Sequence, residues 1–441
     1  MWWWTAARGG RTFRARGKAK EERGTSRLFR APAGSPTIDA AMVRERESTL
    51  SDLRVLDLSD GVAGGYCAKL LADYGADVIK VEPPLGDPTR RHGPFPDDRP
   101  HREAGALWLY LGTNKRSVTL DIAQPTGQRL FRRLVEDANV IVESFPPGYL
   151  DSLGLGFEAL KSIKRRIDVV SITPYGQDGP KAGWRATNLT SFASGGQMSL
   201  TGEPEREPLV NGGYQAEYQA GLQAFAAAAV AAHQADTTEV PQHVDISAQE
   251  CMASALELYL PWWAYLQRDR SKRGGNVLSA MVGVFPAADG HIGLHIMPRN
   301  WPWFARAMGR EELIDDPRFR DNHSRLQHDD ELREIVFAWA AGRKAKEVYR
   351  EAGAARVPVA FVHAVGDLLE SEQLRTRGYF HEVEHPVAGR RTYPGPPVRM
   401  GEVEWQAGRA PLLGEHNREV YCGQLGLSGE ELARLRAAGV V

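Results

Sequence analysis

The stretch LRVLDLSDGVAGGYCAKLLADYGADVIKVEPP, residues 53–84, decides the fold class of this chain. Leu53–Leu58 is a short apolar run that predicts a strand, and Asp77–Glu82 predicts a second one. Between them, Tyr66–Tyr74 carries helical periodicity and ends before Gly75, a residue typical of helix C-termini. Strand, helix and strand in this order predict a βαβ unit, with two parallel strands and a right-handed crossover.

The segment Asp60–Gly65 of this unit reads as a glycine-containing turn between strand and helix. Its GVAGG sequence resembles part of a dinucleotide fingerprint, but the spacing is not GxGxxG, so a nicotinamide site has only weak support. A backbone turn that leads into a helix N-terminus can still hold a phosphate or an adenine group.

The alternation of strands and helices continues beyond this unit, and it predicts an open α/β sheet. Further strands are expected at Ser117–Asp121, Val140–Glu143 and Val169–Thr173, and helices at Gly127–Glu136, Ala220–Gln234 and Ile246–Leu260. The last of these helices is expected to lie in the core, although Glu250 and Glu257 interrupt its apolar positions. Pro261 is expected to end or kink it.

After the charged stretch RDRSKRGG, residues 268–275, the pattern changes to that of a smaller unit. Val282–Phe285 and His291–His295 predict a hairpin around Asp289 and Gly290. The helices expected after it are Trp301–Met308, Asp330–Ala341, Ala345–Ala352 and, near the C-terminus, Gly429–Ala438.

Composition excludes several classes of function. The 441 residues include 55 basic and 56 acidic ones, so the net charge of −1 gives no support for nucleic acid or a membrane as partner. Cys67, Cys251 and Cys422 form no metal-binding or disulfide spacing, which fits a reducing, cytoplasmic location. His101, His243, His323 and His381 also lack ligand spacing; they are expected to be structural, and no metal is proposed.

The first 48 residues differ from the rest, with 11 basic and 5 acidic side chains and no apolar periodicity. An Arg-rich organelle presequence is one interpretation. The interpretation we favour is a disordered tail, or a start codon assigned too early, with Met42 as the beginning, because a segment of high charge and low hydrophobicity does not fold.

Several long motifs resemble those of one known family. They are residues 53–90, NKRSVTLD (114–121), VIVESFPPGYLDSLGLG (140–156), SITPYGQDGP (171–180), MSLTGEPEREPL (198–209), and near the end APLLGEHNREV and LGLSGEELARLRAAGVV. The order and length of these motifs resemble the class III CoA-transferases, the family of L-carnitine dehydratase and bile acid-inducible protein F. The resemblance runs from about Leu53 to the C-terminus.

The resemblance implies an α/β fold with a Rossmann-like open-sheet large domain and a smaller α+β domain. On this basis we expect a tail at 1–48, a large CoA-binding domain at 49–265, a small domain at 266–380 and a C-terminal segment at 381–441 that returns to the large domain. Two chains are expected to interlock as a homodimer. The implied partners are an acyl-CoA and a carboxylic acid, with CoA thioester as substrate and no tightly bound cofactor.

The resemblance also points to a nucleophile. The family places a catalytic Asp at the start of a long helix, and in PLVNGGYQAEYQAGLQAFAAAAVAA, residues 208–232, Glu217 occupies that position. A glutamate can form the same acyl-CoA mixed anhydride and a glutamyl-CoA thioester. Gly212 and Gly213 would allow close backbone approach and an oxyanion site. Without the resemblance, Glu217 would be read as a solvated acid of a first helical turn.

Two alternatives remain open from the residues. A racemase on the same fold uses a His that would fall near Thr187, where it is absent. Asn188 stands where many members have Asp, either as a helix N-cap or as a residue that orients the site. A catalytically silent CoA-binding subunit is the second alternative, because both Glu217 and Asn188 depart from the family pattern.

The CoA site is expected along the first strands. Val62 and Ala63 match positions that contact the nucleotide through backbone, and Leu120 and Phe145 match apolar positions near adenine and pantetheine. The candidate phosphate partners are Arg90, Arg91, Lys115 and Arg116, although such charges are more often a solvated face. Pro146 and Ser152 replace residues that are often basic in the family, which weakens the phosphate contacts or shifts them to the arginines.

Overall fold

The structure, a computed structural model, describes residues 48–203, 205–257, 259–267, 281–400, 405 and 408–441. The N-terminal segment before residue 48 and the charged stretch at 268–275 lie outside the described residues. The interpretations of the N-terminal tail and of the domain boundaries therefore stay predictions.

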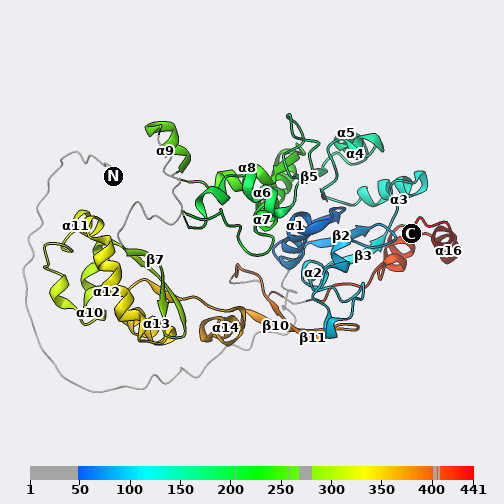
Figure 1. The fold of residues 1–441 in the computed structure, drawn as a ribbon. Helices are drawn as coiled ribbons and strands as arrows, with labels where there is room; N and C mark the ends of the chain where they lie inside the picture. The colour runs from blue at the N-terminus through cyan, green and yellow to red at the C-terminus, as the bar shows by residue number, and fades with distance from the viewer. Residues whose placement is uncertain (1–47, 204, 258, 268–280, 401–404, 406–407) are drawn as a thin grey trace, which may run out of the picture. The chain divides into compact units, whose positions relative to one another are not determined.

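Six parallel strands form the sheet that the βαβ pattern predicts (Figure 1). Their spatial order is β3-β2-β1-β4-β5-β6, so the order reverses between β1 and β4. Such a reversal opens a crevice at the carboxyl ends of the strands, where doubly wound sheets bind their ligands. The strands are β1 Arg54–Asp57, β2 Asp77–Glu82, β3 Arg116–Thr119, β4 Val140–Glu143, β5 Asp168–Thr173 and β6 His243–Ser247.

The turn expected at Asp60–Gly65 is wrong, because helix α1 spans Gly61–Asp73 and begins directly after Asp60. Gly64 is needed for packing rather than for turning: a Cβ atom there would lie 2.1 Å from the Cβ of Ser59. The predicted end of the helix is confirmed, since Gly75 has a φ of +102°.

The helix expected at Ile246–Leu260 is wrong in its bounds, although its middle part is a helix with buried residues. Ile246 belongs to β6, which is followed by α8, Ala248–Ser254, and α9, Tyr259–Leu266. β6 is an edge strand that alternates exposed and partly buried residues, so it lacks the apolar run that marks the central strands. Pro261 lies in the first turn of α9, where proline is tolerated. None of the described residues of α9 is buried, so the expectation of a core helix fails there.

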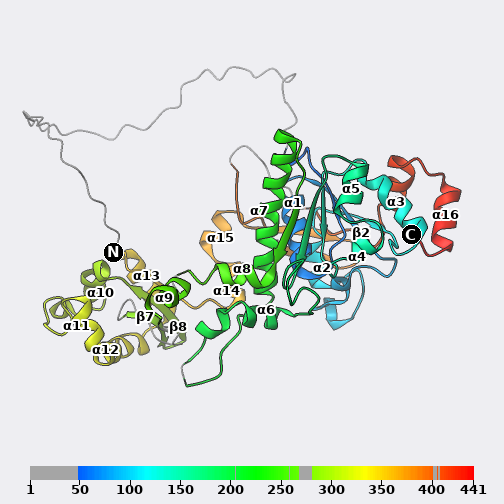
Figure 2. The ribbon, with the colours of Figure 1, turned by 90° about the horizontal axis from the view of Figure 1, so that it is seen from above.

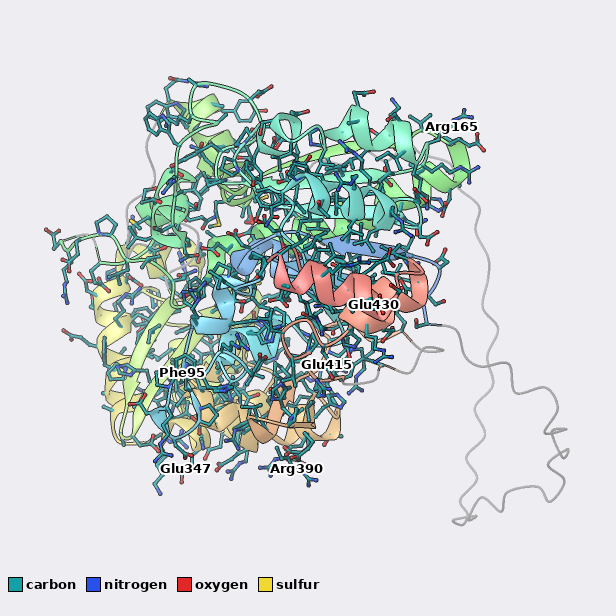
Figure 3. The ribbon with its side chains drawn as sticks, turned by 90° about the vertical axis from the view of Figure 1, so that its right-hand side faces the viewer. Phe95, Arg165, Glu347, Arg390, Glu415 and Glu430 are labelled. Atoms are coloured by element: carbon teal, nitrogen blue, oxygen red, sulfur yellow. The ribbon has the colours of Figure 1, made fainter. Side chains whose placement is uncertain are left out.

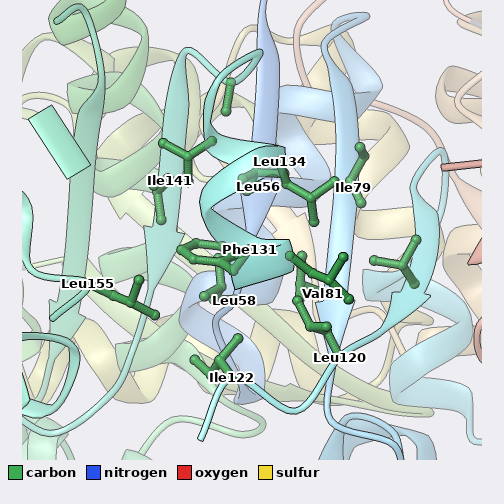
Figure 4. Close-up of a cluster of buried hydrophobic side chains, with 14 of the residues drawn as sticks. Leu56, Leu58, Ile79, Val81, Leu120, Ile122, Phe131, Leu134, Ile141 and Leu155 are labelled. Carbon is green, nitrogen blue, oxygen red and sulfur yellow. The ribbon is translucent and has the colours of Figure 1, made fainter. Parts of the chain in front are cut away.

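Both faces of the sheet are covered by helices, because successive strand residues point to opposite sides. On one face, Phe131 and Leu134 of α3 pack over Leu56, Ile79 and Ile141, as Figure 4 shows. The opposite face is covered by α1, α7 and α8, with Val55, Val140 and Val170 beneath them. The helices that follow the strands of this sheet are α2 Ala106–Leu111, α3 Pro125–Val135, α4 Tyr149–Ser152, α5 Phe157–Ile163, α6 Asn188–Ser194 and α7 Gln215–Thr238.

The later residues form two small antiparallel sheets and short helices. The predicted hairpin is confirmed as β7, Met281–Ala287, and β8, Gly290–Ile296, to which β9, Val359–Phe361, is added. β10, Phe380–His385, pairs with β11, Gly389–Pro394. The helices are α10 Trp301–Ala307, α11 Asn322–Gln327, α12 Asp329–Ala341, α13 Ala345–Ala354, α14 Val365–Glu370, α15 Glu372–Thr376 and α16 Gly429–Ala437.

The C-terminal segment is hydrogen-bonded to β3. The Tyr421 hydroxyl donates to the carbonyl of Thr119 at 2.8 Å, and Asn417 accepts from the Thr119 N–H at 2.8 Å. Glu415 of the same segment, labelled in Figure 3, pairs with Arg409. These bonds join residues about 300 positions apart, so a truncation before this segment would expose the edge at β3.

Helix α7 is built to approach α1 closely, and Figure 2 shows the two helices side by side. Its buried face carries alanines every fourth residue, at Ala216, Ala220, Ala224, Ala228 and Ala232. At Gly221, a Cβ atom would lie 2.4 Å from the carbonyl oxygen of Ala63 in α1. Glycine at this point is therefore required by packing, although it costs helix propensity. Within the described ranges, no helix has the length and apolarity of a membrane span.

We predict that Gly221→Ala lowers the free energy of unfolding by about 1 kcal/mol or more, because overpacking against the Ala63 carbonyl outweighs the gain in helix propensity. Gly353→Ala in α13 is the matched control, since the space around Gly353 is open. Urea denaturation measures both variants. If the two variants were equally stable, the close contact between α1 and α7 would be wrong.

Candidate active site

Glu217 lies in the first turn of α7 and one helical turn before Gly221, so the two residues share a face of the helix. Because Gly221 touches the carbonyl of Ala63, the Glu217 side chain is placed at the N-terminus of α1. There the backbone N–H of Val62 lies close enough to the carboxylate to lower its pKa. The carboxylate thus lies where two helix N-termini meet, which favours its ionised form.

The surroundings of Glu217 oppose that effect. The carboxyl is largely withdrawn from water, and this burial raises its pKa above that of an ordinary glutamate. The nearby Val62 N–H lowers the pKa, the carboxylate of Asp60 raises it, and His92 lowers it. The balance is a raised pKa, in a group that makes no ion pair with any described residue.

Three tyrosine rings, from α1, α2 and α7, pack together next to the start of α7. Tyr218, next to Glu217, meets Tyr66 of α1 edge to face with ring centroids 4.9 Å apart, and Tyr110 of α2 at 6.5 Å. Burial raises the pKa of Tyr218 to about 12, so its hydroxyl stays protonated at neutral pH. Tyr218 also lies close enough to Glu217 for the carboxylate to raise its pKa.

A cavity of about 310 Å³ opens at the carboxyl ends of β1 and β2, beside the switch in strand order. Leu58 and Leu120 form part of its apolar wall, together with Phe145, whose ring packs against Tyr149 at 4.9 Å. Asp60 lines this cavity and also lies close enough to Glu217 to raise its pKa, so the cavity and the carboxylate are neighbours.

Four predicted residues are brought together around this crevice: Val62, Leu120, Phe145 and Glu217. Val62 provides the N–H for Glu217, and Ala63 provides the carbonyl at Gly221. Gly213 has a φ of +75°, a conformation that favours glycine, while Gly212 and Gly213 both face open space. The oxyanion role of these glycines stays a prediction, and the Val62 N–H is a second candidate donor near the carboxylate.

The predicted basic residues are divided between interior and surface. Arg90 is 1% exposed; it pairs with Glu82 at 2.6 Å and Glu103 at 2.7 Å, and its guanidinium stacks on Trp108. Lys115 is buried beside Asp57, with the Nζ and carboxylate oxygen 2.8 Å apart.

Such ion pairs are costly to break, so neither Arg90 nor Lys115 is free to bind a phosphate. Arg116 is held by Asp77 and Glu419. Arg91, in contrast, is exposed and lines the cavity, and none of the described residues pairs with it.

The buried charges have a structural role below the cavity. Lys80 reaches both Asp57, at 3.3 Å, and Asp87, at 3.0 Å. Burial alone would lower the pKa of Lys80, but the nearby carboxylates outweigh burial and raise this pKa. Burial alone would raise the pKa of Asp57, but Lys115 and Lys80 outweigh burial and lower it. This network joins the end of β1 to β2 and to the residue before β3, and so supports the strands beneath the crevice.

Sequence reasoning missed Asp60 and His92, which both act on the charge of Glu217. Asp60 directly precedes the first turn of α1. A correct prediction of where this helix begins would have drawn attention to Asp60. His92 gives no such signal, because it follows a short 3₁₀ turn at Pro88–Arg91.

A second cavity, of about 430 Å³, is lined by Asp73 and Tyr74 at the other end of α1. It is separated from Glu217 by most of that helix, about 20 Å at 1.5 Å per residue.

Comparison with known proteins gives a consistent result. Residues 50–417 match the family described as CoA-transferase family III. The chain is 36% identical over 402 residues to the succinyl-CoA:(R)-benzylsuccinate CoA-transferase subunit BbsE of Thauera aromatica, covering 88% of this chain and 97% of the relative.

It is 34% identical over 404 residues to the succinyl-CoA–D-citramalate CoA-transferase of Chloroflexus aurantiacus, covering 89% and 98%. The crystal structure of a CAIB/BAIF family protein from Brucella suis superposes with a TM-score of 0.76 at 29% identity, covering 86% of this chain and 99% of that one.

We predict that the carboxyl of Glu217 titrates above an ordinary glutamate, and that Asp60→Asn moves its pKa downward, because a negative charge beside it is removed. NMR titration of ¹³C-labelled glutamate carboxyls, with the Glu217 signal assigned by its loss in Glu217→Gln, measures this. Asp52→Asn, at an exposed site before β1, is the control. An unchanged or higher pKa in the Asp60 variant would contradict the electrostatics described above.

Proposed function

The chain belongs to CoA-transferase family III, and on that premise we propose that Glu217 is the side chain that accepts CoA during transfer. The observation that carries this proposal is the position of its carboxylate, held at the Val62 N–H and beside the cavity at the switch in strand order. A half-buried carboxylate that lies near a backbone N–H and forms no ion pair with the described residues is suited to attack a thioester.

In the proposed reaction, a carboxylate oxygen of Glu217 attacks the thioester carbonyl of the donor, and the C–S bond breaks. This gives a mixed anhydride and the CoA thiolate. The thiolate then attacks the glutamyl carbonyl, which forms the glutamyl-CoA thioester and releases the donor acid. The acceptor carboxylate reverses these two steps, leaves as acyl-CoA and regenerates Glu217. The sequence is redox-neutral, and CoA enters as substrate.

The Val62 N–H has a role in each tetrahedral intermediate on the glutamyl carbon. It lies close enough to the Glu217 carboxylate to lower its pKa, so it can stabilise the negative charge that develops there. The raised pKa makes the ionised carboxylate a more basic nucleophile than a solvated glutamate. The tyrosine rings of Tyr66 and Tyr218 keep water from hydrolysing the anhydride.

We propose that CoA lies across the cavity between β1 and β2. Leu120 and Phe145 offer an apolar wall to the adenine or pantetheine, the α1 N-terminus attracts the thioester end, and Arg91 is the cation available for a phosphate. Succinyl-CoA is the proposed donor, because both relatives described above are named for it.

A homodimer in the cytoplasm completes the proposal. Helix α9 exposes Leu260, Trp263 and Tyr265, with 53%, 54% and 85% of these residues accessible, and apolar patches of this kind are typical of association surfaces. The cytoplasm is proposed because Cys67, Cys251 and Cys422 have no disulfide spacing in the sequence, which suits a reducing compartment. Sedimentation velocity that detects only a monomer would contradict the dimer.

We predict that Glu217→Gln lowers kcat about a thousandfold or more, because the amide is not a nucleophile. Glu217→Asp keeps the carboxylate but shortens its reach, and should lose about a hundredfold. Transfer of CoA from succinyl-CoA to a panel of carboxylic acids, followed by chromatography, gives the rates. Calorimetry with CoA should find binding within about twofold of the unchanged protein. Near-normal transfer by the glutamine variant would remove Glu217 from the mechanism.

For the phosphate contact, we predict that Arg91→Met weakens CoA binding about tenfold, the loss of one charge-assisted hydrogen bond. The variant should weaken the binding of dephospho-CoA less if Arg91 holds the 3′-phosphate. Arg99→Met, at an exposed arginine that does not line the cavity, is the control. Equal affinity of the Arg91 variant and the control for CoA would mean that another group holds the phosphates.

A further inference from the structure

The start of α7 is not capped by its own residues. Tyr214 occupies the N-cap position and its side chain makes no capping hydrogen bond. Gly213, before it, is in the left-handed conformation. The first N–H groups of a helix need partners, and an uncapped end frays. Since Glu217 lies in this first turn, fraying would displace the carboxylate.

Asn188, the first residue of α6, supplies the missing partners from a different helix. Its Oδ1 accepts from the Ala216 N–H at 2.9 Å, and its Nδ2 donates to the carbonyl of Gly213 at 3.0 Å. The sequence interpretation took Asn188 as a possible N-cap of its own helix, but the N-cap of α6 is Thr187. Asn188 instead accepts a hydrogen bond from a first-turn N–H of α7.

Ala216, which donates its N–H to Asn188, is also held by apolar packing. Ala216 is fully buried and packs with Phe192 of α6 and Met252 of α8. One side chain thus joins the loop before α7 to the residue directly before Glu217.

We propose that Asn188 is a positioning residue for Glu217, and that its amide is required because it is used at once as acceptor and as donor. This inference rests on the proposed role of Glu217 as the acyl acceptor. An aspartate could accept from Ala216, but when ionised it would have no proton for the Gly213 carbonyl and would turn a negative charge toward the first turn of α7. In this chain the carboxamide therefore fits the site better than a carboxylate.

The expected kinetic signature separates positioning from binding. Asn188→Ala should lower kcat about tenfold to a hundredfold, because misplacement of a reacting group on the ångström scale has effects of this size. The KM for succinyl-CoA should stay within about twofold, since Asn188 does not line the cavity.

Asn188→Asp should lower kcat and also move the acid limb of its pH profile to higher pH. It adds a negative charge to an environment that already holds Asp60, His92 and the Tyr218 hydroxyl around Glu217.

Thr190→Ala is the matched control on the same helix. The Thr190 hydroxyl bonds the N–H of Thr187 and so supports α6 without touching α7. Its loss should reduce stability but leave kcat and the pH profile unchanged. A general structural role of α6 would instead make the Thr190 and Asn188 variants lose kcat alike, which would overturn the inference.

Two outcomes separate this inference from the proposed function. Glu217 labelled by acyl-CoA in the unchanged protein, together with normal kcat and pH profile in both Asn188 variants, would overturn the role of Asn188 alone. Absence of label on Glu217 in an active unchanged protein would remove the nucleophile itself. If Asn188→Ala is too unstable to assay, the pH shift of Asn188→Asp decides, and an unshifted limb overturns the inference.

Discussion

The close contact between α7 and α1 at Gly221 is the constraint on which the site depends. With no side chain at this residue, the backbone of α7 can lie against the Ala63 carbonyl. One helical turn earlier, the same face presents Glu217 to the Val62 N–H. The alanines that repeat along α7 extend this approach over the helix, so the position of one carboxylate is set by a whole buried face.

The charged side chains around this contact form two groups, a buried network of ion pairs and the carboxylate at the crevice. In the interior, the carboxylates of Asp57 and Asp87 neutralise Lys80 and Lys115. Arg90 pairs with Glu82 at the end of β2 and donates to the Pro411 carbonyl of the C-terminal segment. At the crevice, none of the described residues forms an ion pair with Glu217. Burial and helix dipoles act on it in opposite directions, which leaves an ionisable group of raised pKa beside the cavity.

The sequence predicted the central sheet well, because buried parallel strands such as Val140–Glu143 are short continuous apolar runs with little ambiguity. It failed at β6, where an exposed edge strand lacks that run, and at the start of α1, where Gly64 signalled a turn but serves packing. For the site, the resemblance to the family was what pointed to the carboxylate of Glu217 as the candidate nucleophile. Whether an arginine is free or buried depends on partners distant in sequence, so Arg90 and Arg91 could not be told apart.

The most direct test of the account is to find the covalent intermediate. The protein is incubated with succinyl-CoA, treated with borohydride to reduce any acyl thioester, digested and analysed by mass spectrometry. The account predicts that the side-chain carboxyl of Glu217 is converted into a primary alcohol, and only when the donor is present. Reduction at a different residue, or none at all while CoA transfer proceeds, would contradict the central claim.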